Sequence, residues 1–145
     1  MNPVSIEPVV WSKLHGAATH FPIALVLVAA LCDTLSHLPL GADSRRALRS
    51  TAGVSLVLGA LGSYAAVLSG LLMTRWQVWG NAAMLRHHQF AWPAFALVTA
   101  LAAWRIVTRQ ANSQAPGIGY SCVLILTSVL IGAAGYWGGE LLNRG

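Results

Sequence analysis

Four long apolar stretches follow one another along the chain, at about residues 17–38, 50–74, 89–107 and 111–139. Each approaches or exceeds the ~20 residues that an α-helix needs to cross a bilayer. The second and fourth contain no charged residue, whereas Asp33 lies in the first and Arg105 near the end of the third. We therefore predict an all-α integral membrane protein, a four-helix bundle that forms a single transmembrane domain over residues 1–145.

Composition supports a membrane protein. The chain is 56% hydrophobic and only 9% charged, whereas soluble domains carry about 25% charged residues. So few charged residues cannot cover the surface of a soluble fold. The first partner that we expect is therefore the lipid bilayer. The net charge of +5 is too dispersed for a nucleic-acid interface, and no nucleic-acid partner is predicted.

Charge also suggests an orientation in the membrane. Arg45, Arg46 and Arg49 lie close together between the first two stretches, and such clusters near helix ends favour the cytoplasmic side. With four crossings, both termini then face the opposite side. We predict a multi-pass protein of the bacterial inner membrane with both termini in the periplasm.

Two of the stretches begin with a pair of histidines followed by a proline: His15, His20 and Pro22 in the first, and His87, His88 and Pro93 in the third. An even number of crossings separates the pairs, so both lie at the same membrane face. Imidazoles on facing helices of a bundle are typical axial ligands of haem iron. Because the chain has no Cys-x-x-Cys-His sequence, we predict one noncovalent haem b.

Helical geometry limits each helix to one ligand. His15 and His20 are about 140° apart around a helix, and His87 and His88 are about 100° apart. We favour His20, which begins the membrane helix, and assign His15 to an interfacial turn. We favour His88 over His87 because it shares a face with Trp92. The predicted iron ligands are thus His20 and His88; in the alternative interpretation all four are interfacial histidines without a ligand.

Small residues recur along one face of the second and fourth stretches: Gly59, Ser63, Ala66 and Gly70, and Ser128, Gly132, Gly135 and Gly139. Such faces allow helices to pack closely in lipid; they also leave room for a flat macrocycle, with Gly70 and Gly139 nearest the histidines. The ends of the two stretches resemble each other, Ser-Gly-Leu-Leu-Met-Thr-Arg and Gly-Gly-Glu-Leu-Leu-Asn-Arg. We therefore predict two repeated helical hairpins with the same topology.

Charged groups at membrane depth suggest further roles. Asp33 and His37 share a helix face and Arg105 ends at a similar depth, which predicts an ion pair or triad or, alternatively, a proton pathway. Glu140 is level with the histidine pairs. It could orient a ligating histidine or accept a proton from a quinol, or pair with Arg144.

The segments His-Phe-Pro-Ile-Ala-Leu at residues 20–25 and Gly-Tyr-Trp-Gly-Gly-Glu-Leu at 135–141 resemble a bacterial family of small four-helix membrane proteins, domain-of-unknown-function family 2231. The resemblance covers nearly the whole chain and implies the four-helix fold. It flags His20, a histidine at the start of the third helix, and residues 138–141. It also implies companions such as periplasmic c-type cytochromes or dehydrogenase subunits. The chain departs from the family pattern at Gly16, where a proline commonly follows the first histidine.

We therefore predict a membrane b-type cytochrome subunit that transfers electrons between the quinone pool and a periplasmic redox partner. Quinone is a second expected cofactor, and the chain is an electron-transfer subunit rather than a stand-alone enzyme. Two alternatives stay open: a cofactor-free anchor or assembly subunit of a respiratory complex, and a small metal or proton transporter. A larger membrane complex or a homodimer also stays open.

Overall fold

The computed structural model describes residues 6–80, 82–110 and 116–143, which form four helices and, in these ranges, no strand. The helices are α1 (Ile6–Leu35), α2 (Ala42–Met73), α3 (Ala82–Gln110) and α4 (Ile118–Asn143). Each contains a segment long and apolar enough to cross a membrane: Lys13–Leu35, Ala42–Met73, Met84–Thr108 and Ile118–Leu141. The predicted all-α membrane bundle with four spans is confirmed.

The first three helices begin before the apolar runs that predicted them. Because α1 starts at Ile6, His15 is helical, and its assignment to an interfacial turn is wrong. Because α2 starts at Ala42, the arginine cluster lies in the first turns of that helix rather than in a loop. An apolar run marks only the part of a helix that crosses hydrocarbon, whereas alanine, leucine and arginine continue a helix beyond it. The predicted start of the fourth run, at Ala111, lies outside the described residues.

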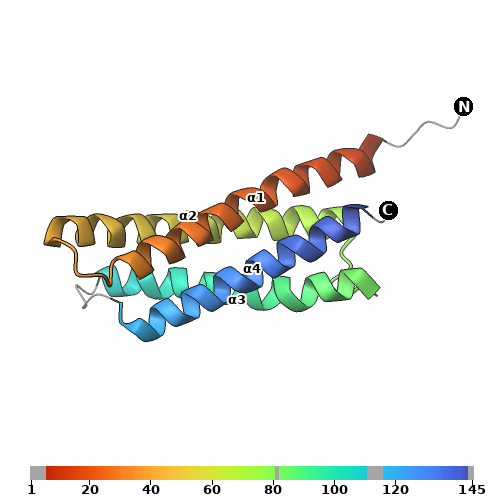
Figure 1. The fold of residues 1–145 in the computed structure, drawn as a ribbon. Coiled ribbons are helices and arrows are strands. Elements are labelled where there is room, and N and C mark those ends of the chain that lie inside the picture. The colour runs from red at the N-terminus through yellow and green to blue at the C-terminus, as the bar shows by residue number, and fades with distance from the viewer. Residues whose placement is uncertain (1–5, 81, 111–115, 144–145) are drawn as a thin grey trace, which may run out of the picture.

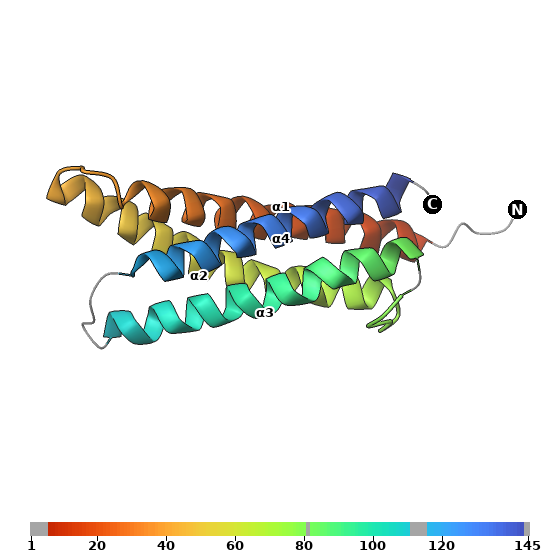
Figure 2. The same cartoon turned by 60° about the horizontal axis from the view of Figure 1, so that its bottom comes forward.

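The helices follow one another around the bundle. α1 packs chiefly on α2 and α3 on α4, and smaller contacts of α1 with α4 and of α2 with α3 close the ring. α1 and α3 therefore occupy opposite corners. Figures 1 and 2 place the start of α1, the end of α2, the start of α3 and the end of α4 at one end of the bundle, here named the terminal end. The opposite end is named the loop end.

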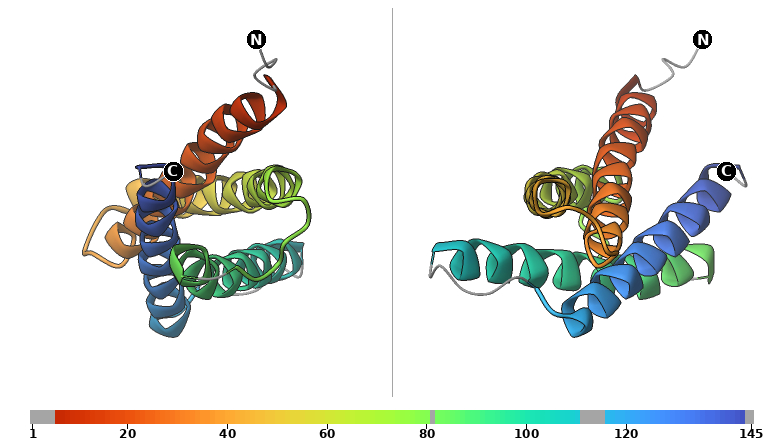
Figure 3. Two further views of the ribbon diagram at one scale, coloured as in Figure 1. Left: turned by 90° about the vertical axis from the view of Figure 1, so that its right-hand side faces the viewer. Right: turned by 60° about the vertical axis from the view of Figure 1, so that its left-hand side comes forward.

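The two hairpins run in the same direction, as predicted, because α1 and α3 both run from the terminal end to the loop end (Figure 1). Their helices cross obliquely rather than lying parallel (Figure 3). The core between the two ends is built from fully buried apolar side chains on all four helices: Val26, Leu56, Val98 and Leu124. Many other apolar side chains face outward, such as Leu61 and Val129, each 62% exposed, as expected for a surface in contact with lipid.

The small residues of α2 do bring two helices together. A Cβ atom at Gly59 would lie 3.0 Å from Val26 Cγ2 on α1, and one at Gly70 would lie 3.0 Å from His15 Cε1. The corresponding face of α4 is divided. A Cβ at Gly135 would lie 3.1 Å from Ile23 Cδ1, whereas Gly132 and Gly139 border open space. The α2 stripe is therefore a packing face, and only part of the α4 stripe is.

Candidate functional site

His15 projects from α1 toward α2 at the terminal end of the bundle. Its Nδ1 lies 3.0 Å from the hydroxyl oxygen of Ser69. That hydroxyl donates its own proton to the carbonyl of Ala66, at 2.9 Å, so it accepts a hydrogen bond from His15 Nδ1–H. A neutral imidazole with its proton on Nδ1 has a free electron pair on Nε2. His15 is thereby oriented with Nε2 as its available ligand atom.

His87 has the same arrangement on α3. Its Nδ1 lies 2.8 Å from the carbonyl oxygen of Ala134 on α4. A carbonyl can only accept, so the proton is again on Nδ1 and the free electron pair of the neutral ring is on Nε2. Histidines that bind metals are commonly held this way, with the second ring nitrogen donating to a carbonyl or a similar acceptor.

A glycine lies beside each of these rings. A Cβ atom at Gly70 would lie 3.0 Å from His15 Cε1, and one at Gly138 would lie 3.3 Å from His87 Nδ1. Glycine permits such a close approach because it has no Cβ. Each hairpin therefore builds the same unit, in which a histidine of its first helix lies against a glycine of its second. Gly70 was predicted at this site, but on α4 the contacting residue is Gly138 rather than Gly139.

The two units lie at the same end of the bundle, because His15 and His87 both lie in the first half of their helices, α1 and α3. These helices occupy opposite corners. One imidazole of each predicted pair therefore bonds to a neighbouring helix at the terminal end, and these are His15 and His87.

The two histidines first favoured as ligands lie elsewhere. His20 is on the exposed side of α1, and its Nδ1 lies 2.5 Å from the carbonyl oxygen of Gly16 on the same helix. The half-buried His88 lies between the rings of Trp79 and Trp92, with ring centroids 6.5 Å and 6.0 Å away. Among the contacts of the described residues, none joins His20 to His88.

The sequence contained a signal for the inward face that we did not use. A charged residue inside a membrane span faces the protein interior. Asp33 follows His15 by eighteen residues, and Arg105 follows His87 by eighteen. Eighteen residues are five full helical turns at 3.6 residues per turn. Each of these histidines thus shares a face with the charged residue of its own helix, which His20 and His88 do not.

Aromatic rings extend from the site toward the surface. His87 and His88 have ring centroids 5.5 Å apart, and His88 contacts Trp79, which is 64% exposed. On the other side of His88 the rings of Trp92, Phe95 and Tyr64 follow in order. Sequence analysis placed Trp92 on the face of His88 but did not identify this continuous row.

Glu140 and Arg86 also lie at the terminal end, in α4 and α3. Glu140 is half-buried in the last turns of α4. One role considered for it was to accept a proton from a ring nitrogen and so orient a histidine. For the Nδ1 protons of His15 and His87, the acceptors are Ser69 and Ala134. Arg86 stacks 4.9 Å from the ring centroid of Trp137. Arg144 lies outside the described residues. Within the described ranges, no group of three or more His, Cys, Asp or Glu side chains is arranged to hold a metal ion.

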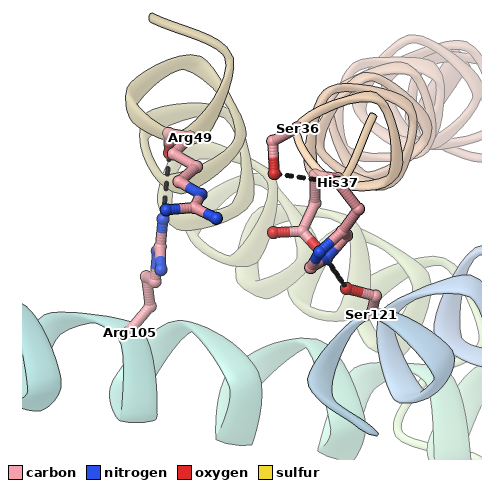
Figure 4. Close-up of polar contacts among 6 residues, drawn as sticks. Ser36, His37, Arg49, Arg105 and Ser121 are labelled. Carbon is pink, nitrogen blue, oxygen red and sulfur yellow. Dashed lines mark hydrogen bonds and ion pairs between the residues drawn. The ribbon is translucent and has the colours of Figure 1, made fainter. Parts of the chain in front are cut away.

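A second polar cluster occupies the loop end (Figure 4). His37 Nε2 lies 3.9 Å from Asp33 Oδ2, which confirms the predicted pair. Arg105 does not complete a triad: its Nη2 donates to the carbonyl of Arg49, at 3.0 Å, and its guanidinium lies 6.0 Å from the ring centroid of Tyr120. The third member of this group is instead Ser121 of α4, which donates to Asp33 Oδ2.

The fold and its exposed apolar surface define a multi-pass helical membrane protein. The chain belongs to the DUF2231 family, described as a predicted membrane protein, whose pattern matches residues 12–145. This confirms the resemblance identified from the His-Phe-Pro and Gly-Gly-Glu-Leu segments. No curated protein and no solved structure shows significant similarity to the chain.

Proposed function

We propose that this protein is a b-type cytochrome subunit that binds one noncovalent haem through His15 and His87. The observation that carries the proposal is that these two imidazoles form the same kind of hydrogen bond. Each comes from a different hairpin, each donates from Nδ1 to a neighbouring helix, and each keeps Nε2 for a ligand. Two such nitrogens would hold the iron of a haem.

The residues around the two histidines suit this cofactor. Ser69 and Ala134 fix the tautomer and the ring orientation of the histidines, which tunes a ligand through its second nitrogen. Gly70 and Gly138 remove bulk next to the rings. The haem, when bound, supplies one-electron redox chemistry. The chain supplies the two ligands, excludes water with apolar helices, and sets the reduction potential through these surroundings.

The location of the site suggests its partners. His15 and His87 both lie near the beginning of their spans, Lys13–Leu35 and Met84–Thr108, and so close to one membrane face. The cluster of Arg45, Arg46 and Arg49 lies at the opposite, loop end, which the positive-inside rule assigns to the cytoplasm. We place the haem on the periplasmic side of a bacterial inner membrane, where it passes electrons between the quinone pool and a periplasmic c-type cytochrome or dehydrogenase subunit.

The test is the visible spectrum of the detergent-purified protein, oxidised and then reduced with dithionite. Wild type from haem-replete cells is expected to show sharp reduced α and Soret bands, and both His15→Ala and His87→Ala are expected to lose them. His20→Ala is the matched control, because His20 lies on the same helix but on its exposed side. It is expected to keep the spectrum.

Each other outcome overturns a stated part of the proposal. Loss of the bands in His20→Ala and His88→Ala, with His15→Ala unaffected, would show that the ligands are the pair first favoured from the sequence. A colourless wild type would leave a cofactor-free anchor or assembly subunit. Bound metal without a Soret band would indicate a metal transporter.

A further inference from the structure

The loop end of the bundle contains a carboxylate that is buried far from the histidine site. Asp33 is 1% exposed and follows His15 by eighteen residues on α1, about 27 Å at 1.5 Å per residue. A buried ionisable group in a membrane span is costly and is usually retained for a function. The proposed haem ligands do not use it, so its role is a separate question.

Asp33 is joined to its surroundings by a short chain of hydrogen bonds across two helices. The hydroxyl of Ser121 on α4 donates to Asp33 Oδ2, at 2.5 Å. His37 Nε2 lies 2.8 Å from the same hydroxyl oxygen. Because the proton of Ser121 points to the carboxylate, His37 donates its Nε2–H to Ser121. The donors therefore run in one direction, from His37 through Ser121 to Asp33. Figure 4 shows the contact between His37 and Ser121.

The two ends of this chain differ in their access to water. The side chain of His37 is 30% exposed and that of Asp33 is 2% exposed. His37 lies just beyond the end of α1 at Leu35, at the boundary of the bundle. The chain thus connects an accessible imidazole to a buried carboxylate, and imidazole is the side chain that exchanges protons near neutral pH.

The charged and titratable groups near Asp33 come from three parts of the bundle. On its own chain segment the group is His37. On α4 it is Tyr120, which the charges of Asp33 and of Arg105 on α3 both reach. The Arg105 guanidinium donates to the Arg49 carbonyl of α2. In the described part of the chain, no lysine or arginine forms an ion pair with Asp33.

We propose that Asp33 is a proton-binding site filled from the loop-end face through His37 and Ser121. Starting from a doubly protonated His37, the Nε2 proton moves to the Ser121 oxygen while the Ser121 hydroxyl proton moves to Asp33 Oδ2. The step leaves a neutral imidazole with its proton on Nδ1, an intact hydroxyl and a carboxylic acid. One proton is transferred, charge is conserved, and the reverse step returns it. This inference does not depend on the proposed haem.

The experiment is infrared spectroscopy of the purified full chain after a rapid change of pH, following the carbonyl stretch of a protonated carboxylic acid. Wild type is expected to gain bands of this kind on acidification, and Asp33→Asn is expected to lack the component that belongs to Asp33. Ser121→Ala removes the intermediate hydroxyl and is expected to slow the appearance of the band at least tenfold. Ser121→Thr restores a hydroxyl and is expected to restore the rate.

A matched control variant tests the relay, and isotopic labelling gives a second way to assign the infrared band to Asp33. Ser128→Ala removes an equally buried hydroxyl on α4 that bonds only within its own helix, to Leu124, and is expected to exchange at the wild-type rate. Since the chain has two aspartates, Asp33 and Asp43, isotopically labelled aspartate in an Asp43→Asn background marks Asp33 alone, even if Asp33→Asn does not fold. Absence of a titrating labelled acid would overturn the site, and a wild-type rate in Ser121→Ala would overturn the relay.

Discussion

The two ends of the bundle use the same helix faces for different arrangements. At the terminal end, His15 and His87 donate to neutral acceptors and lie against glycines. At the loop end, Asp33 and Arg105 occupy the corresponding positions: Asp33 accepts from Ser121, and Arg105 lies against Gly53 and donates to the carbonyl of Arg49. The polar side chains of the terminal end are thus imidazoles bonded to neutral groups, whereas those of the loop end are a carboxylate and a guanidinium bonded to neighbouring helices.

The comparison shows how one pattern supports two polar sites in a membrane protein. The eighteen-residue spacing places a histidine and a charged residue on one face of α1, and another such pair on one face of α3. Between the ends lies the buried apolar layer that includes Val26 and Val98. At the two ends, hydrogen-bond partners on other helices offset the cost of burying polar groups, whereas buried hydroxyls between the ends, such as those of Ser63 and Ser128, bond within their own helices.

The largest effect is expected from adding bulk at the terminal end. A leucine in Gly138→Leu would meet the ring of His87, whose Nδ1 lies 3.3 Å from the Cβ position of residue 138. Overpacking costs up to about 3 kcal/mol, so we expect haem affinity to fall about 100-fold, measured by titration of the apoprotein with haem. Gly139→Leu projects into open space and should bind as wild type. Equal losses in both would contradict a role for the Gly138 contact.

A smaller effect is expected from removing the acceptor of His15. Ser69→Ala leaves His15 in place but frees its Nδ1, and loss of such an orienting partner weakens metal binding by about tenfold or more. We expect a roughly tenfold loss of haem affinity and no change in the infrared band of Asp33. Ser63→Ala is the control, because its buried hydroxyl bonds only to Gly59 of its own helix. An unchanged affinity in Ser69→Ala would show that Ser69 does not orient a ligand.

The smallest effect is expected at the loop end. Arg105→Gln removes the hydrogen bond between α3 and the Arg49 carbonyl of α2, which is worth about 1 kcal/mol of unfolding free energy. We expect reversible denaturation in detergent to show this loss while haem affinity stays unchanged. Arg46→Gln is the control, since its ion pair with Asp43 is almost fully exposed and such pairs contribute little. A loss of haem in Arg105→Gln would show that the two ends are not independent.

Much of the fold could be predicted from the sequence because a bilayer imposes strong local rules. A long apolar run has to be a helix in hydrocarbon, since its backbone groups have no other partners there. The number of spans, the family and the shared end of the histidine pairs all followed from runs and motifs in the chain. The ends of the helices did not follow, because polar helix beyond the bilayer leaves no apolar run.

The candidate site was harder to predict because it depends on helix rotation and on contacts between helices. The sequence determined that one histidine of each pair could face inward. The rotation of α1 and α3 directs His15 and His87 toward neighbouring helices. Five helical turns link these histidines to Asp33 and Arg105. The partners Ser69, Ala134 and Ser121 lie 47 to 88 residues from the side chains that they contact. No local pattern encodes such pairs, because they exist only once the four helices have packed.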